Sequence, residues 1–167
     1  MIWQLTNGGI EEFSILVFAN EDEVFAGMFE MDGKPKHWSV RPRVEPFVDK
    51  RKKQQKPLAD ISYVTHGTIV LNGKAYAALG EFLSRFGQLL ELDCNGEVYY
   101  FYNVTNLIDA IDVDCSGLEG KSVVKEAFRQ DAIPSTAQIF KDPRTAHHAI
   151  YVNQAAKAVN RRGDHPQ

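Results

Sequence analysis

The sequence is poor in the features that mark secreted, membrane-spanning or nucleic-acid-binding proteins. It has only two cysteines, Cys94 and Cys115, and their spacing indicates neither a disulfide framework nor a zinc site. No apolar run is long enough to span a bilayer, and the first residues lack the positive flank and apolar core of a signal peptide. The net charge of −3 offers no bulk attraction for nucleic acid. We therefore expect a reduced, cytoplasmic protein that binds neither membranes nor nucleic acid.

The motifs of common catalytic sites are also missing. The chain contains no GxSxG nucleophile turn and neither of the glycine-rich phosphate-binding patterns, GxxxxGK[ST] and GxGxxG. Cys115 follows Asp114, and a neighbouring carboxylate raises the pKa of a thiol, which argues against a thiolate nucleophile. His37 and His66 are isolated, and each is interpreted as a structural histidine. These observations predict a protein that is not an enzyme, with no catalytic residue and no bound cofactor.

Two patterns that resemble metal sites lack a necessary ligand. Residues 112–117 (DVDCSG) match the start of a calcium-binding EF-hand loop, but the twelfth position, which should be a bidentate glutamate, is Val123. His147 and His148 are adjacent, so on a strand they would point to opposite faces and could not bind one ion. No HExxH motif or suitably spaced third ligand follows. We expect no metal site.

Strand signals recur along most of the chain. Residues 13–19 form a nearly continuous apolar run, which predicts a strand at the centre of a sheet. Pro42 and Pro46 indicate that the extended segment near them lies at an edge or is irregular. The pair Asn95-Gly96, between two strand-like runs, predicts a tight antiparallel hairpin. The predicted strands are residues 1–5, 13–19, 38–40, 44–48, 89–93, 97–103, 123–128, 138–141 and 149–152.

Helix signals are fewer. The clearest helix runs over about 73–86, with Asn72 as its N-cap and Gly87 at the position of a left-handed C-cap. Asn153 is expected to cap a short helix over 154–160. A third, short helix or turn is expected over 21–29. The pattern predicts an α+β fold in a single domain, mainly antiparallel sheet with one principal helix and a short C-terminal helix. The domain would span 1–160, followed by a polar, frayed tail over 161–167.

Charged residues gather in two stretches. Residues 50–56 form a basic run that is interpreted as a solvated loop, although such a run can also contact phosphates or an acidic partner. The aromatic strand over 97–103 is followed by three acids, Asp109, Asp112 and Asp114. These are interpreted as turn formers and solvated acids that can contact a basic partner.

The order of several segments resembles a known protein family. These segments are the VLN-K-A run with Leu79 and Leu83 (70–83), G-LL-L (87–92), YYFYNVT (99–105), LIDAID (107–112), IFK (139–141) and IYV (150–152). As an ordered set over about residues 60–159, they resemble a family of bacterial immunity proteins from polymorphic-toxin and type VI secretion systems, formerly a domain of unknown function. The resemblance implies a protein that binds and neutralises a cognate secreted toxin domain by forming a stoichiometric complex.

Two other interpretations stay open. One is a small-ligand-binding protein or hydrolase whose site is assembled from scattered residues such as His37, His66 and Tyr102; a deep pocket lined by them would support it. The other is a self-associating structural module with a large apolar dimer face. The immunity protein is the preferred interpretation, with Asp109, Asp112 and Asp114 as partner-binding residues and a homo-oligomer possible.

Overall fold

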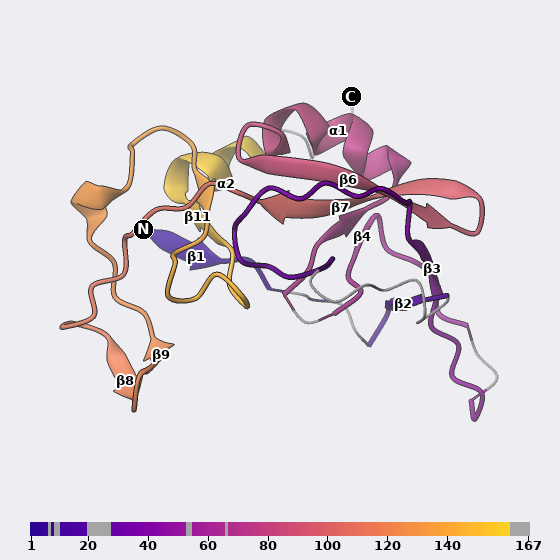
Figure 1. Ribbon diagram of the computed structural model, residues 1–167, viewed down its shortest axis with the longest axis horizontal. Coiled ribbons are helices and arrows are strands. Elements are labelled where there is room, and N and C mark those ends of the chain that lie inside the picture. The colour runs from indigo at the N-terminus through magenta and orange to yellow at the C-terminus, as the bar shows by residue number, and fades with distance from the viewer. Residues whose placement is uncertain (7, 9–10, 20–27, 53–54, 66, 161–167) are drawn as a thin grey trace.

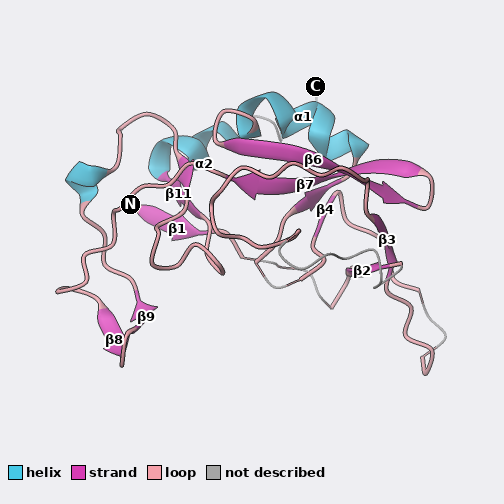
Figure 2. Cartoon of the chain, in the orientation of Figure 1, coloured by secondary structure: helices cyan, strands magenta, loops and turns pink. Residues whose placement is uncertain are grey.

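In the part of the chain that the structure describes, two main sheets and two α-helices make up an α+β fold, as the sequence predicts (Figures 1 and 2). The computed structural model describes residues 1–6, 8, 11–19, 28–52, 55–65 and 67–160. A six-stranded sheet has the order β2-β3-β6-β7-β5-β4, a three-stranded sheet has the order β1-β11-β10, and β8 and β9 form a separate hairpin. The elements are β1 (Ile2–Gln4), β2 (Leu16–Phe18), β3 (Arg43–Pro46), β4 (Ile61–Ser62), β5 (Val70–Leu71), α1 (Gly73–Leu83), β6 (Gly87–Cys94), β7 (Glu97–Val104), β8 (Gly117–Glu119), β9 (Ser122–Lys125), the 3-10 helix η2 (Gln130–Ala132), β10 (Ile139–Phe140), β11 (Tyr151–Asn153) and α2 (Gln154–Asn160).

The hairpin of β6 and β7 is the longest pairing in the described structure. It runs in unbroken antiparallel register from Gly87 opposite Val104 to Cys94 opposite Glu97. Asn95 and Gly96 both have positive φ, 54° and 88°, as the tight two-residue turn requires. The prediction of an antiparallel hairpin around this pair is confirmed.

The position predicted for β2 is wrong. The sequence places the strand in the centre of a sheet, whereas β2 lies at one end of the six-stranded order. The sheet curls, however, so that residues near β4 approach the outer side of β2. The N–H of Leu16 donates to the carbonyl of Tyr63 (2.9 Å), and the N–H of Ser14 donates to the carbonyl of Pro57 (2.9 Å). This second set of partners explains why Leu16 is fully buried although it belongs to an end strand.

The position predicted for β3 also needs correction. Its prolines suggest an edge or irregular segment, yet β3 lies between β2 and β6. The structure accommodates them because they occur at the ends of the strand. Pro42 precedes β3, and its carbonyl accepts from the N–H of Asp93 (2.9 Å). Pro46 is the last residue of β3 and is paired with Leu16 of β2. The missing N–H groups therefore do not interrupt the short ladder.

Helix α1 begins where predicted and ends three residues early. The side chain of Asn72 accepts from the N–H of Ala75 (2.9 Å), which confirms the N-cap. Gly87 is not a left-handed C-cap: it starts β6. Its glycine identity is explained by a close approach of backbones, since a Cβ there would lie 2.2 Å from the carbonyl oxygen of Asn103.

The side chains of β7 alternate between two cores. Tyr99 and Phe101 belong to a first core inside the curled sheet, together with Leu16, Val44 and Leu92. Tyr102 and Val104, on the opposite face, belong to a middle core formed with α1, β5, β11 and α2. The aromatic run in this strand is thus explained by burial of both of its faces.

Strand β11 alternates in the same way. Val152 belongs to the middle core, while Tyr151 belongs to a third core on the other face of the three-stranded sheet, with Ala110, Phe140 and Ala149. The prediction that Asn153 caps a C-terminal helix is confirmed: its side chain accepts from the N–H of Ala156 (3.0 Å). Figure 1 shows the three-stranded sheet and α2 beside the end of the larger sheet that α1 covers.

Several predictions fall on residues outside the described part of the chain. These are most of the short helix over 21–29, two positions of the turn at 7–9, His66, and the tail over 161–167. In the basic run, Lys50, Arg51 and Lys52 are exposed. Within the described residues, no helix is long and apolar enough to cross a bilayer.

Replacing Gly87 with alanine should strongly destabilise the fold. The added Cβ would collide with the backbone of β7, which cannot move without disrupting the hairpin. We expect the free energy of unfolding to fall by about 2–4 kcal/mol, measured by urea denaturation. Gly73→Ala is the control, because a Cβ there meets nothing within 4 Å and alanine favours helix. Equal stability of the two variants would contradict this account of Gly87.

Lys141 is a buried lysine that directly follows β10. Its side chain is 2% exposed, and the ammonium donates to the carbonyl of Met31 (3.0 Å). Burial lowers the pKa of Lys141 to about 8; the nearby Asp32 opposes this shift, and Lys36 adds to it. Both neighbours lie on the 31–36 segment, whose backbone is anchored to Gln88 and, through Lys34, to Asn103.

Stability should therefore rise with pH between about 8 and 10.5. Above pH 8 the folded state loses the Lys141 proton, whereas the unfolded chain keeps it up to the ordinary pKa of 10.5. Below pH 8 both states are charged and the contribution is constant. Unfolding free energies of the wild type and Lys141→Met should diverge across this window by up to about 3 kcal/mol. Lys121→Met, which removes an exposed lysine, serves as control; parallel curves for the wild type and Lys141→Met would contradict the assignment.

Candidate functional site

Residues 107–128 form an arm that carries the acids predicted to bind a partner. The arm contains β8 and β9, and Figure 1 shows this hairpin projecting from one end of the molecule, away from both main sheets. It holds five acidic residues and two lysines, so its formal net charge is −3. The arm is thus the acidic projection of an otherwise nearly neutral chain.

The base of the arm is fixed by a buried carboxylate. Asp142 is fully buried, and its Oδ2 accepts from the backbone N–H groups of Ala110 and Ile111, both at 2.8 Å. Its Oδ1 accepts from the N–H of Arg144 (2.9 Å). Three hydrogen bonds from backbone N–H groups stabilise the buried charge of this carboxylate, so it does not need a salt bridge of ideal geometry. Asp142 therefore anchors the start of the arm to the turn that follows β10.

Asp109 is engaged within the protein. Its carboxylate accepts from the guanidinium groups of Arg144 (2.5 Å) and Arg129 (3.0 Å). The hydrogen bond from Arg144 lowers the pKa of Asp109 below its usual value, and the charges of Arg144 and Arg129 act in the same direction. The residue is exposed, so the pairs remain accessible to solvent. Asp109 joins the two ends of the arm and offers a partner less negative charge than the sequence suggests.

Asp112 and Asp114 have different environments. Asp112 is half-buried; its carboxylate accepts from the N–H of Cys115 (3.2 Å), and its carbonyl accepts from the hydroxyl of Ser116. It is a turn former, as expected. Asp114 is exposed. A hydrogen bond with Asp112, together with the charge of Asp112, raises the pKa of the exposed Cys115 thiol, in the direction expected from its acidic neighbours.

Exposed apolar side chains accompany these acids. Val113, Leu118 and Val124 are 36%, 46% and 55% exposed. Leu118 lies on β8 beside Glu119, and Val124 lies on β9. Leu118 is paired with Val123, so alternation places Val124 on the other face of the hairpin, and the arm exposes apolar side chains on both of its faces. Exposed apolar side chains close in sequence to charged ones are typical of protein-binding surfaces. In this region the sequence predicts a strand only over 123–128, without a core-facing side, so it does not single out these exposed side chains.

The other candidate residues that the structure describes do not form a common site; His66 lies outside the described residues. Tyr102 is buried, its hydroxyl donates to the carbonyl of Leu83 (2.9 Å), and its burial raises its pKa well above the usual range. His37 is exposed and does not line the cavity that Tyr102 faces. His147 and His148 lie in an exposed turn rather than on a strand.

No metal-binding cluster of three or more His, Cys, Asp or Glu side chains occurs among the described residues. The loop that resembles an EF-hand runs into the β8–β9 hairpin, and Val123 pairs with Leu118 there. The calcium interpretation needs a carboxylate at position 123, but this residue is a valine and is paired within the hairpin.

Comparison with known proteins does not identify a family. A scan against protein-family models gives no match, and a search of curated proteins gives none either.

Asp142→Asn should loosen the arm. An amide retains one acceptor oxygen and directs an NH2 group toward backbone donors, so at least one buried N–H would lose its partner. We expect a loss of about 2–3 kcal/mol of stability and faster proteolytic cleavage within 107–128. Asp131→Asn, at an exposed position in η2, is the matched control and should behave as the wild type. Unchanged stability and cleavage in Asp142→Asn would contradict the anchoring role.

Proposed function

We propose that this protein is a bacterial immunity protein that binds and neutralises a cognate secreted toxin domain by forming a stoichiometric complex. The proposal combines the family resemblance of residues 60–159 with one feature of the structure. That feature is the projecting arm (Figure 1), on which Leu118, Val124 and the acids Asp114 and Glu119 are exposed. The protein acts by occupying a surface of the toxin, without turnover, and it does so in the cytoplasm of the cell that it protects.

The chemistry of the arm supports a basic partner. Asp114 and Glu119 are exposed and have no ion-pair partner among the described residues, whereas Asp109 is paired with two arginines. Acidic side chains around an apolar centre favour fast encounter with a basic surface, and the apolar contacts then slow dissociation. Asp112 shapes the turn that carries Asp114.

Substitutions on the arm should weaken toxin binding in a graded way. Leu118→Asp places a charge at the centre of the contact and should reduce affinity about 30-fold or more, the size of a hot-spot loss. Asp114→Lys reverses a rim charge and should reduce it about fivefold, with a smaller effect at high salt. Affinity for the C-terminal domain of the adjacent secreted protein would be measured by calorimetry, and protection by survival of cells that express this domain.

The matched control is Val40→Asp, which alters an equally exposed apolar residue away from the arm. It should bind and protect as the wild type does. Wild-type binding by both arm variants would remove the arm from the interface. The immunity proposal itself fails if the wild-type protein neither binds that domain nor protects cells. If the arm variants instead dissociate a homo-oligomer, the self-associating module becomes the better interpretation.

A further inference from the structure

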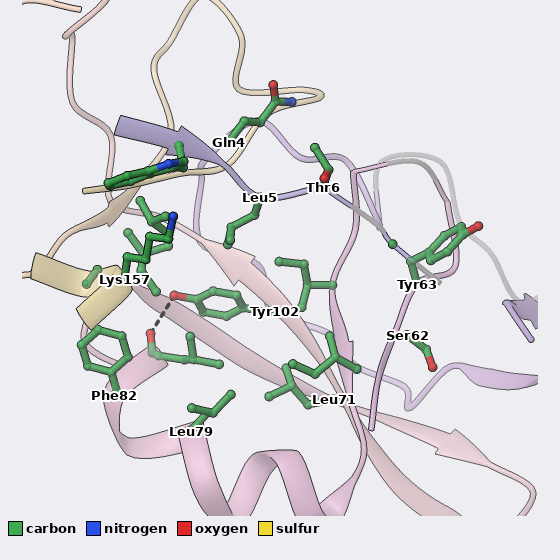
Figure 3. Close-up of a pocket in the computed structure, with 18 residues that line it drawn as sticks. Gln4, Leu5, Thr6, Ser62, Tyr63, Leu71, Leu79, Phe82, Tyr102 and Lys157 are labelled. Carbon is green, nitrogen blue, oxygen red and sulfur yellow. Dashed lines mark hydrogen bonds between the residues drawn. The ribbon is translucent and has the colours of Figure 1, made fainter. Parts of the chain in front are cut away.

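A cavity of about 590 Å³ opens within the middle core, between the three-stranded sheet and the part of the larger sheet that α1 covers. Figure 3 shows Tyr102 in its centre, with Lys157 and Phe82 at one end and Ser62 and Tyr63 at the other. Its size falls within the range of about 300–1,000 Å³ that small-molecule sites occupy. It lies on different elements from the arm.

The walls of this cavity are apolar and incompletely covered. Trp3, Leu5, Ile69, Leu79 and Phe82 all pack against the middle core, yet each stays only half-buried. All five line the cavity, which is why their burial is incomplete. Apolar surface left in contact with water favours an apolar occupant, because filling the space removes that surface from water.

At the floor of the cavity, the hydroxyl of Tyr102 already has a hydrogen-bond partner within the protein. The hydroxyl of Tyr102, the only polar group of its side chain, donates to the carbonyl of Leu83 at 2.9 Å, and Figure 3 shows this bond directed toward α1. Leu71 and Leu79, which also line the cavity, lie below the ring in this view. An occupant with a polar group at this depth would lose hydrogen bonds to water without replacement, so the floor selects an apolar body.

The cationic side chain of Lys157 lies at one end of the cavity. The Lys157 ammonium lies 4.0 Å from the centre of the Trp3 ring, which holds it beside the cavity. Lys157 is half-buried, and none of the carboxylates in the described part of the chain forms an ion pair with it. An anionic group at this end would complete the charge pair, while the apolar body extends past Tyr102 toward Ser62.

We propose that the cavity binds a small amphiphile with one anionic head group and an unbranched apolar chain, such as a medium-chain carboxylate. The head group pairs with Lys157, and the chain lies against Leu79, Phe82 and Tyr102. This binding activity goes beyond the proposed toxin inhibition and does not depend on it, because the arm contributes no residue to the cavity.

The probe is dodecanoate, titrated into the full-length protein with the fluorescence of the two tryptophans, one of which is Trp3, as readout and calorimetry as confirmation. Octanoate and decanoate give the chain-length series. Each added methylene should raise affinity roughly fourfold, the value expected for complete burial. Dodecanol, which lacks the charge, should bind about tenfold more weakly than dodecanoate.

Three variants locate the site. Lys157→Gln should weaken dodecanoate about tenfold and leave dodecanol unchanged. Leu79→Trp fills the cavity and should abolish binding of both. Because Leu79 touches the core, Thr6→Trp, at an exposed position on the cavity lining, provides a second block that does not alter the packing. Lys121→Gln, an exposed arm lysine, is the control and should bind as the wild type does.

The proposal is overturned if dodecanoate does not bind the wild type, or if Lys157→Gln and both blocking variants bind it unchanged. Equal affinity for dodecanol and dodecanoate would overturn the anionic head group. Sedimentation provides a further check: a wild-type dimer that dissociates in Thr6→Trp would mean that a second copy of the chain covers the cavity, which also overturns the proposal. Loss of dodecanoate binding in Thr6→Trp and Leu79→Trp, with a monomeric wild type, supports it.

Discussion

Strand β7 carries large side chains on both faces, so each face needs its own apolar partner. On one side Tyr99 and Phe101 fill the inside of the curled sheet; on the other, Tyr102 and Val104 meet α1 and the three-stranded sheet. A sheet with one solvated face could not satisfy this strand. The curl of the sheet and the docking of the second sheet are both consequences of burying one aromatic run on two sides.

Strand β11 repeats this constraint, and the two strands together place three cores side by side. The middle core lies between β7 and β11, and it is bounded by two sheets and two helices of unequal length. Elements of both sheets and both helices meet there, and Trp3 of β1 and Leu79 of α1 both line the cavity. The cavity occurs in this core, where several large side chains are only half-buried. Its location follows from how the elements meet, because the side chains that line it belong to segments far apart in the sequence.

Local signals predicted the parts of the fold that depend on neighbouring residues. The Asn95-Gly96 turn and the caps at Asn72 and Asn153 are all interactions within a few residues, and the structure has them where they were expected. The errors concern strand order and close approach. The sequence near Leu16 cannot reveal that the carbonyl of Tyr63 accepts from the Leu16 N–H on the outer side of β2. Likewise, Gly87 resembles a helix cap until Asn103 is placed against it.

The acidic segment shows the same difference between local interactions, which the sequence predicts, and long-range contacts, which it does not. Three aspartates close in sequence were predicted to act together, but their partners come from later parts of the chain: Arg129 and Arg144 reach Asp109, while Asp112 stays within its own turn. Internal pairing leaves Asp114 as the acid of the three that is exposed and unpaired among the described residues. Charge alone therefore distinguishes the arm less than the sequence suggests. In the proposed complex, specificity would then depend more on exposed apolar side chains such as Leu118, because apolar contacts at the centre of an interface contribute more affinity than solvated charges at its rim.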